Sequence, residues 1–461
     1  MQSLSRAFTS GRQSATGRGE PRLVSVTIPM PFIDAVTLFE AAAEAEERAF
    51  WEQPEEQFSL VAVGAAARLT GCGAERIDQV TAAWRQLTAG AVSSTVGVCP
   101  VRAPVCLGGF AFEPANGRDS AWQDHPDALL TLPRFLFVSH NGSSWLIASE
   151  LVGPGSDAET EALLADLAAL LARADGVSAH QESGGAVAVS DDIDSAQWKE
   201  TVGAVVREIR SGAVSKLVLA RQVLARADES LAWGPVLRRL RMRYRGCTTF
   251  AFARGASCFL GATPERLVRL DGQDVRVDCL AGSARRGATE NEDRSLGEAL
   301  LGDEKERHEH ALVVDAMRET LEPLCTALRV PDRPRLLPMP NVQHLHTPVQ
   351  GTLIEERHVL DLVARLHPTP AAGGVPQQAA CSLIRSYESF DRGWYAGPVG
   401  WIDGRGGGEF VVAIRSALLR GQEALLYAGC GIVAGSDPER EYQESCLKLE
   451  PMLWAMNGKD S

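Results

Sequence analysis

The sequence lacks the features that mark several classes of protein. No apolar run approaches the roughly 20 residues that a membrane-spanning helix needs. The 10 cysteines are scattered and include no C-x-x-C pair, which is typical of reduced, mostly buried thiols. There is no internal repeat and no low-complexity tract. We therefore expect a cytoplasmic protein that does not associate with membranes.

Basic residues are scarce relative to acidic ones. The chain has 46 Lys and Arg against 59 Asp and Glu, which gives a net charge of −13. We do not expect nucleic acid as a partner, because neutralising phosphates requires a basic surface. A local basic pocket for a small anion is compatible with this balance. The 461 residues, 45% apolar and 23% charged, are typical of a soluble globular protein and fit one large domain.

The N-terminus differs in composition from the rest of the chain. Residues 1–19 contain three Arg, many Ser, Thr and Gly, and no acid, which predicts a disordered arm, although a transit peptide has a similar composition. Ser, Gly and Asp gathered over 183–192 predict a linker. We therefore expect an N-terminal α/β part over 20–190 and a catalytic region over 191–461, both within one large domain.

Hydrophobic periodicity predicts helices and strands in both parts. In the N-terminal part it predicts helices over 39–50, 74–87 and 157–174, and strands over 105–112 and 135–138. In the catalytic region it predicts helices over 195–211, 304–328 and 438–456, and strands over 216–224, 248–253, 257–262, 266–270, 275–280, 408–419 and 423–433. Hairpins with long helices between them indicate an α+β fold, with large antiparallel sheets and helices packed outside.

The segment His367–Pro376 contains three prolines and two glycines, so it can continue neither a helix nor a strand. Apolar runs over 359–366 and 378–384 predict a helix on each side. A loop held between two helices suits the wall of a binding site, although an ordinary proline-rich turn has the same composition.

Two candidate acid–base residues each have an ordinary alternative. Lys216 begins a predicted strand that is otherwise apolar; it is either a solvated edge lysine or a buried lysine with a lowered pKa that acts as a base. Glu265 lies in the turn Gly261–Arg266, between two apolar strands; it is either a solvated carboxylate or an acid directed into a cleft.

Glu309 lies on the apolar face of the predicted helix over 304–328, since Leu312, Val313, Ala316 and Met317 follow it at helical spacing. A carboxylate in that position needs a cation or a proton. His308 and His310 flank it, but residues two apart on a helix cannot chelate one zinc ion.

The last predicted helix places Glu441, Glu444 and Lys448 on one face, either as a solvated ion-pair face or as a metal site. An all-oxygen site built from two glutamates suits Mg²⁺, which retains water molecules and borrows substrate oxygens. The glycine-rich segment 428–433 brings backbone amides towards the start of this helix, which suits a carboxylate. Arg415 is a lone charge in an apolar strand, and a bidentate carboxylate partner would explain it.

The region from about 195 to 457 resembles the chorismate-utilising enzymes, which include anthranilate, aminodeoxychorismate, salicylate and isochorismate synthases. The resemblance implies the chorismate-binding fold and is weaker over the N-terminal third. The matching segments are Lys216–Arg221, Gly261–Arg266, Leu280–Arg286, Arg307–His310, His367–Pro376, Asp391–Gly397, Ala413–Arg415, Ala428–Val433 and Glu441–Lys448.

The resemblance implies a role for nine residues. Lys216 and Glu265 are implied as the acid–base pair, and Glu309 and Glu444 as Mg²⁺ ligands. The implied substrate-binding residues are Ala371, Arg415, Gly429, Lys448 and His344.

Two alanines point to isochorismate synthase within this family. Aminodeoxychorismate synthases have a nucleophilic lysine where this chain has Ala281, and anthranilate and salicylate synthases have a threonine where it has Ala371. The implied substrate is chorismate, with no glutaminase subunit, and we expect a monomer or a weak homo-oligomer. Salicylate synthase, an amine-transferring enzyme and a non-catalytic chorismate-binding protein remain as alternatives. The resemblance leaves open whether the product serves menaquinone, siderophore or salicylate synthesis.

Overall fold

The computed structural model describes residues 22–115, 121–152, 157–177, 187–191 and 194–458. The arm predicted over 1–19 and residues 183–186 and 192 of the predicted linker lie outside these ranges. Residues 187–191 of that linker form a strand instead, because they pair with a neighbouring strand of the catalytic region.

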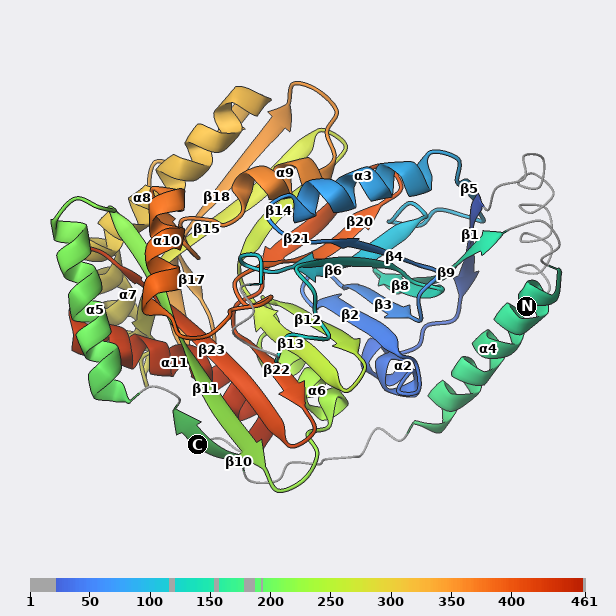
Figure 1. Cartoon of the computed structure of the whole chain (residues 1–461), viewed down its shortest axis with the longest axis horizontal. Helices are drawn as coiled ribbons and strands as arrows, with labels where there is room; N and C mark the ends of the chain where they lie inside the picture. The colour runs from blue at the N-terminus through green and yellow to red at the C-terminus, as the bar shows by residue number, and fades with distance from the viewer. Residues whose placement is uncertain (1–21, 116–120, 153–156, 178–186, 192–193, 459–461) are drawn as a thin grey trace.

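Two large sheets face one another (Figure 1). The first contains, in spatial order, β10 (Val187–Asp191), β11 (Lys216–Ala227), β23 (Glu423–Ile432), β22 (Ser416–Arg420), β13 (Ser257–Thr263), β12 (Thr248–Arg254), β2 (Glu47–Gln53), β3 (Phe58–Val63), β8 (Phe135–His140), β9 (Ser143–Val152), β1 (Arg22–Met30) and β5 (Val92–Thr95), with β19 (Gly374–Val375) beside β11. The second contains β16 (Cys325–Arg329), β18 (Val342–Leu353), β15 (Asp274–Arg285), β14 (Arg266–Asp271), β21 (Gly408–Val412), β20 (Pro398–Asp403), β6 (Val105–Phe110), β7 (Ala128–Leu132) and β4 (Ala67–Gly71), with β17 (Arg335–Pro338) beside β18.

Both sheets combine strands from the N-terminal part and the catalytic region. β2 pairs with β12 in the first sheet, and β6 pairs with β20 in the second. Within the described residues, β1 and β5 form the one parallel pair, and every other pair is antiparallel. This agrees with the predicted large antiparallel sheets, including the hairpin that Asp271 and Gly272 form between β14 and β15.

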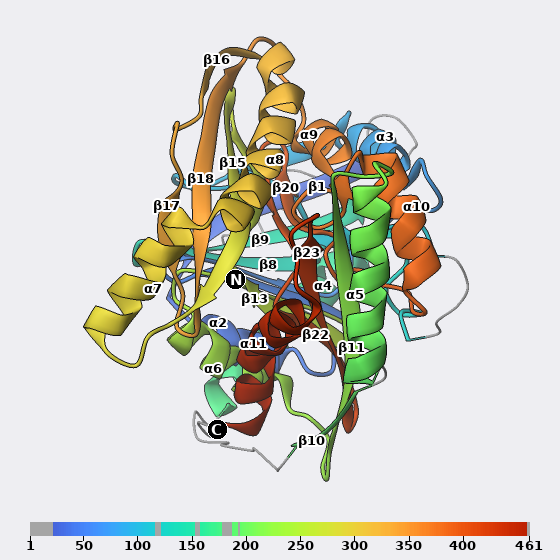
Figure 2. The same cartoon turned by 90° about the vertical axis from the view of Figure 1, so that its left-hand side faces the viewer.

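Helices cover the outer faces of the sheets. They are α2 (Ala35–Ala41), α3 (Arg76–Thr88), α4 (Asp157–Gly176), α5 (Ser195–Arg210), α6 (Trp233–Arg243), α7 (Glu290–Gly302), α8 (Glu304–Leu321), α9 (Val359–Leu366), α10 (Gln377–Tyr387) and α11 (Pro438–Asn457), with the 3₁₀ turn η2 (Glu322–Leu324). Figure 2 shows α11 between α5 and α6, and it contacts both helices and β23.

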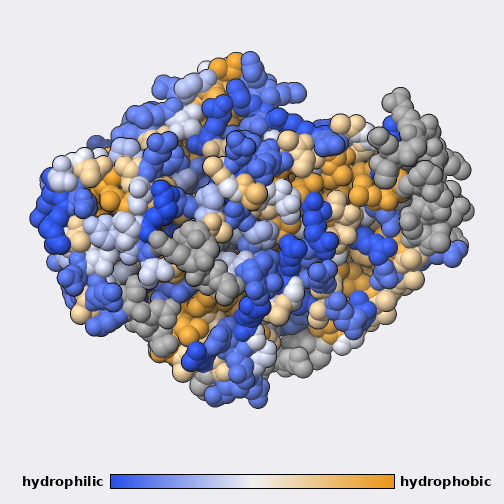
Figure 3. All heavy atoms as spheres, viewed as in Figure 1, coloured by the Kyte–Doolittle hydropathy of each residue, from blue (hydrophilic) through white to orange (hydrophobic). Residues whose placement is uncertain are grey.

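Successive side chains of a strand point to opposite faces of its sheet, so one strand can contribute to two apolar cores. Phe250 and Phe252 of β12 point into the core between the sheets, whereas Ala251 and Ala253 point into a second core beneath α2, α4, α6 and α11. The face of the molecule in Figure 3 is mostly hydrophilic, with separate small hydrophobic areas. In the part of the chain that the structure describes, no helix is long and apolar enough to cross a membrane.

Three predicted elements are wrong in their bounds. The helix predicted over 39–50 ends at Ala41, and Glu47–Gln53 forms β2, because pairing with β3 and β12 outweighs helix propensity. The helix predicted over 304–328 ends at Leu321, where Pro323 enters a 3₁₀ turn. The strand predicted over 408–419 is two strands in different sheets.

Candidate active site

A cavity lies where β11 and β23 of the first sheet approach β15 of the second, with the His367–Pro376 loop on one side. Eight of the nine predicted site residues line this cavity, and Lys216 contacts one of them. The lining residues are Val218, Pro264, Glu265, Leu280, Ala281, Gly282, Ser283, Glu309, His344, Ala371, Ala372, Arg392, Tyr395, Ala396, Ile414, Arg415, Gly429, Gly431, Glu444 and Lys448.

Lys216 is completely buried at the start of β11, so it is not a solvated edge lysine. Its ammonium lies 3.0 Å from Oε1 of Glu309, which is also buried, on α8. Gly431 leaves room for this ion pair, because a Cβ there would lie 1.9 Å from Glu309 Oε1 and 2.9 Å from Lys216 Cε. Glu309 therefore has the cation that its position on an apolar helix face required.

Glu265 is buried in the turn between β13 and β14, so it is not a solvated carboxylate. Its backbone N–H donates to Thr263 Oγ1, and its carbonyl accepts from the Val412 N–H. Burial raises the pKa of Glu265 to about 7, although the charges of Lys216 and Arg415 oppose the shift. A carboxyl group with this pKa can donate a proton near neutral pH.

Glu444 and Glu441 project from the first half of α11, because a spacing of three residues places them on one face. One carboxylate oxygen of each lies within 4.8 Å of the other and of Cys430 Sγ. Lys448 lies 2.5 Å from Glu444, and its charge, with that of Lys305, outweighs burial and lowers the Glu444 pKa. Burial and the nearby Glu444 raise the Glu441 pKa.

The donor set fits a hard divalent cation. Among the residues that the structure describes, none donates a hydrogen bond to the buried Oε2 of Glu441, and such an oxygen is costly to bury unless a cation or donor reaches it. The Cys430 thiol donates to the Glu441 carbonyl, and burial holds its pKa well above its usual value, so it stays a neutral thiol. Carboxylate oxygens without an available thiolate suit Mg²⁺ rather than Zn²⁺.

Arg415 occupies the break between β21 and β22, with φ of +53°, rather than the middle of a strand. Among the described residues it pairs with no carboxylate; its Nη2 donates to His344 Nε2 at 3.2 Å. Because a guanidinium only donates, the other imidazole nitrogen carries the proton and donates to Ser283 Oγ. Burial lowers the His344 pKa to about 3, so the ring is neutral. Arg415 therefore keeps donors for an anion in the cavity.

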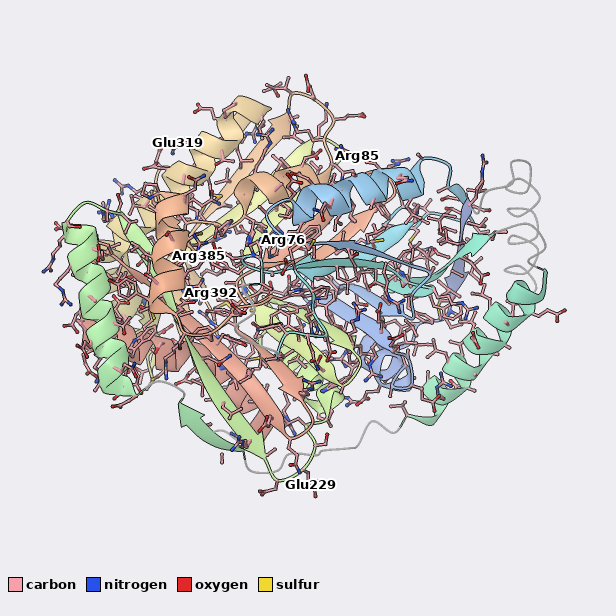
Figure 4. All side chains as sticks on the ribbon, in the orientation of Figure 1. Arg76, Arg85, Glu229, Glu319, Arg385 and Arg392 are labelled. Carbon is pink, nitrogen blue, oxygen red and sulfur yellow. The ribbon has the colours of Figure 1, made fainter. Side chains whose placement is uncertain are left out.

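The His367–Pro376 loop is fixed to the strand that carries Lys216. Val375 and Gly374 pair with Lys216 and Leu217, which makes β19 a short partner of β11. Behind the loop, Arg392 donates to the Ala372 and Val218 carbonyls, at 2.9 and 2.8 Å. Arg392 is also paired with Glu388, and Figure 4 shows it close to α10. The buried Arg392 side chain therefore holds both the loop and β11 in place.

We expect Arg392→Met to lower the free energy of unfolding by about 3–5 kcal/mol, because it removes the charge partner of the buried Glu388 carboxylate. The double variant Arg392→Met/Glu388→Gln should recover part of that loss. Urea unfolding of wild type, both single variants and the double variant measures this coupling. If the two single losses simply add, the two residues do not act as a pair.

Sequence reasoning assigned no individual role to four residues of the site: Glu441, which it placed on the same helix face as Glu444, Lys305, Tyr395 and Gly431. Glu441 precedes Glu444 by three residues, and Gly431 follows Gly429 by two, so the spacing of both gave a signal. Tyr395 lies in a segment that the resemblance already included, and burial raises its pKa to about 12. Nothing in the sequence pattern distinguished Lys305 from a solvated lysine.

Comparison with known proteins adds three findings. The sequence profile described as chorismate binding enzyme matches residues 9–457. The chain is 38% identical to the salicylate biosynthesis isochorismate synthase of Pseudomonas aeruginosa, over 99% of this chain and 95% of that protein. It is 36% identical to the isochorismate synthase MenF of Bacillus subtilis, over 95% of this chain and 94% of that protein.

Two solved structures are similar to this chain. The menaquinone-specific isochorismate synthase MenF of Escherichia coli superposes with a TM-score of 0.79 and 26% identity, over 98% of this chain and all of that one. Anthranilate synthase component I of Streptococcus pneumoniae has a TM-score of 0.68 at 21% identity, over 87% of this chain and 93% of that one. The latter likeness concerns the fold alone.

Proposed function

This chain belongs to the chorismate-binding enzymes, and we propose that it is an isochorismate synthase, which converts chorismate reversibly to isochorismate. One observation carries the choice within the family: Ala281 and Ala371 both line the cavity. An alanine at 281 offers no amine for covalent capture of the ring, and one at 371 offers no hydroxyl to a bound intermediate. The relatives named as isochorismate synthases support the same choice.

In this reaction Lys216 takes a proton from a water molecule whose oxygen bonds to ring C2. Glu265 gives its proton to the C4 hydroxyl, which leaves as water while the ring double bonds shift. One water is added and one is lost, so the reaction is an isomerisation. Lys216 must be neutral to act, whereas its ammonium pairs with Glu309 here. In the active state Glu309 therefore needs another cation partner or a proton.

Glu309 and Glu444 would hold Mg²⁺, with Glu441 close by. When bound, the ion would supply positive charge that offsets the substrate's ring carboxylate and the charge that develops on it. Arg415, Lys448 and the Gly429 backbone would hold the substrate carboxylates. His344 keeps Arg415 aimed into the cavity without adding charge of its own.

Incubation of the purified protein with chorismate and Mg²⁺, followed by chromatography, tests the proposal. We expect isochorismate and residual chorismate in a constant ratio, reached from either compound because the reaction is reversible. A non-catalytic chorismate-binding protein would leave chorismate unchanged. Since water is the nucleophile, no glutaminase subunit is needed, and neither glutamine nor ammonium should change the products. The cytoplasmic location and the monomeric or weakly oligomeric state remain predictions.

Ala371→Thr should shift the products towards those of salicylate synthase, the second candidate. Ala371 contributes only a methyl group to the cavity wall, and threonine adds a hydroxyl that can hold the bound intermediate. We expect slower release of isochorismate or the appearance of pyruvate, measured in the same chromatographic assay. Ala371→Ser, which adds the hydroxyl without the γ-methyl group of threonine, separates the effect of the hydroxyl from that of the added volume. An unchanged product profile in both variants would remove residue 371 from the choice of product.

A further inference from the structure

Lys305 lies in the first turn of α8 and reaches α11. Its ammonium is 2.9 Å from Glu306 Oε1, 2.9 Å from Glu441 Oε1 and 3.9 Å from Glu309 Oε2. The side chain is only 20% exposed, and all three carboxylates are buried. This one cation therefore connects the two helices that carry the proposed metal ligands.

The local helix does not account for a lysine at this position. The first turn of a helix favours negative charge, because its free N–H groups carry partial positive charge. Asp303 already caps this end by accepting from the Lys305 and Glu306 N–H groups. The surrounding carboxylates, rather than α8, make the position favourable for a cation, and they raise the Lys305 pKa against the effect of burial.

The formal charges of the cluster show what Lys305 does. With every group ionised, the cluster has one more negative than positive charge. Its carboxylates are Glu306, Glu309, Glu441 and Glu444, and its ammonium groups are Lys216, Lys305 and Lys448. Without Lys305 the excess would be two negative charges. Within the described part of the chain, Oε2 of Glu441 has no hydrogen-bond partner, although Lys305 contacts Oε1 of the same carboxylate. The cluster therefore has capacity for more positive charge than the lysine supplies.

We propose that Lys305 is a built-in counter-cation, which neutralises the carboxylate cluster in the metal-free protein and competes with a divalent cation for the same oxygens. The inference rests on the proposed function in one respect, that Mg²⁺ is the divalent cation. Lys305 is then a positioning residue: it keeps α8 and α11 together before metal binds and lowers the affinity for metal.

Titration calorimetry on metal-free protein at pH 8 tests this without any turnover. We expect Lys305→Met to bind MgCl₂ about tenfold more tightly than wild type or better, because the competing charge is gone. Lys305→Arg keeps the charge and should stay within about threefold of wild type. Lys199→Met is the matched control. Lys199 pairs with Glu439 of α11 at 2.6 Å and is 32% exposed, but it contacts none of the cluster carboxylates, so its loss should leave Mg²⁺ affinity unchanged.

Thermal unfolding gives a second readout. Metal-free Lys305→Met should melt at a lower temperature than wild type, and saturating Mg²⁺ should remove most of that difference. Equal or weaker Mg²⁺ binding by Lys305→Met overturns the proposal, and so does the absence of Mg²⁺ binding by every variant. Chorismate turnover by the same preparations tests the proposed function separately. If Lys305→Met converts chorismate but binds Mg²⁺ no more tightly than wild type, the proposal for Lys305 is wrong and the proposed function stands.

Discussion

Glu265→Gln and Lys216→Ala should each lower the turnover of chorismate by about a hundredfold or more, the usual contribution of a general acid or base. Chorismate binding should weaken much less, because neither residue is assigned to a substrate carboxylate. Steady-state kinetics and a direct binding titration separate the two effects. A variant that retains near-normal turnover would remove its residue from the acid–base pair.

The pH profile gives a sharper test of Glu265. Burial raises its pKa to about 7, so the carboxyl group is mostly protonated below pH 7 and loses its proton above it. As a general acid it should make kcat/KM fall as the pH rises through this value. The residual activity of Glu265→Gln should not show this decrease in kcat/KM with rising pH. Glu52→Gln is the matched control, because burial also raises the pKa of Glu52, which does not line the cavity, and it should keep the wild-type profile.

EDTA should abolish turnover, and added Mg²⁺ should restore it, if the carboxylates of α8 and α11 hold the metal. Glu309→Gln should lose most of its activity, more than about a hundredfold, since charge stabilisation by a metal contributes several kcal/mol. Circular dichroism should show an intact fold. Glu319→Gln is the control on the same helix, because Glu319 lies ten residues beyond Glu309 on α8 (Figure 4) and is exposed. Full activity in EDTA would leave Glu309 as the structural partner of Lys216.

The strands of the catalytic region could be predicted because their information is local. Asp271 and Gly272 specify a tight turn, and apolar runs on either side specify the hairpin. The helix predicted over 39–50 was wrong because the information that decides its structure is not local. The Ala- and Glu-rich composition of these residues favours a helix, but β2 lies between β3 and β12, and that pairing is not visible in the local sequence.

The candidate site likewise combines features that the local sequence predicts with features that depend on distant parts of the chain. Lys216, Glu265 and Glu309 could be selected because each is a charge in an apolar setting, and all three are buried. Which of these residues contact one another could not be predicted from the sequence. Lys216 pairs with Glu309 across about 90 residues of sequence, and Lys305 joins α8 to α11. The break at Arg415 also escaped prediction, because an apolar run continues through the point where the chain changes sheets.

The ratio of pyruvate to isochorismate formed by the wild-type protein tests the central claim most directly. Chorismate and Mg²⁺ are supplied at neutral pH, pyruvate is followed with lactate dehydrogenase, and isochorismate is measured by chromatography. An isochorismate synthase should give isochorismate with little pyruvate or salicylate. Stoichiometric pyruvate, with isochorismate only transient, would contradict the account and identify a salicylate synthase.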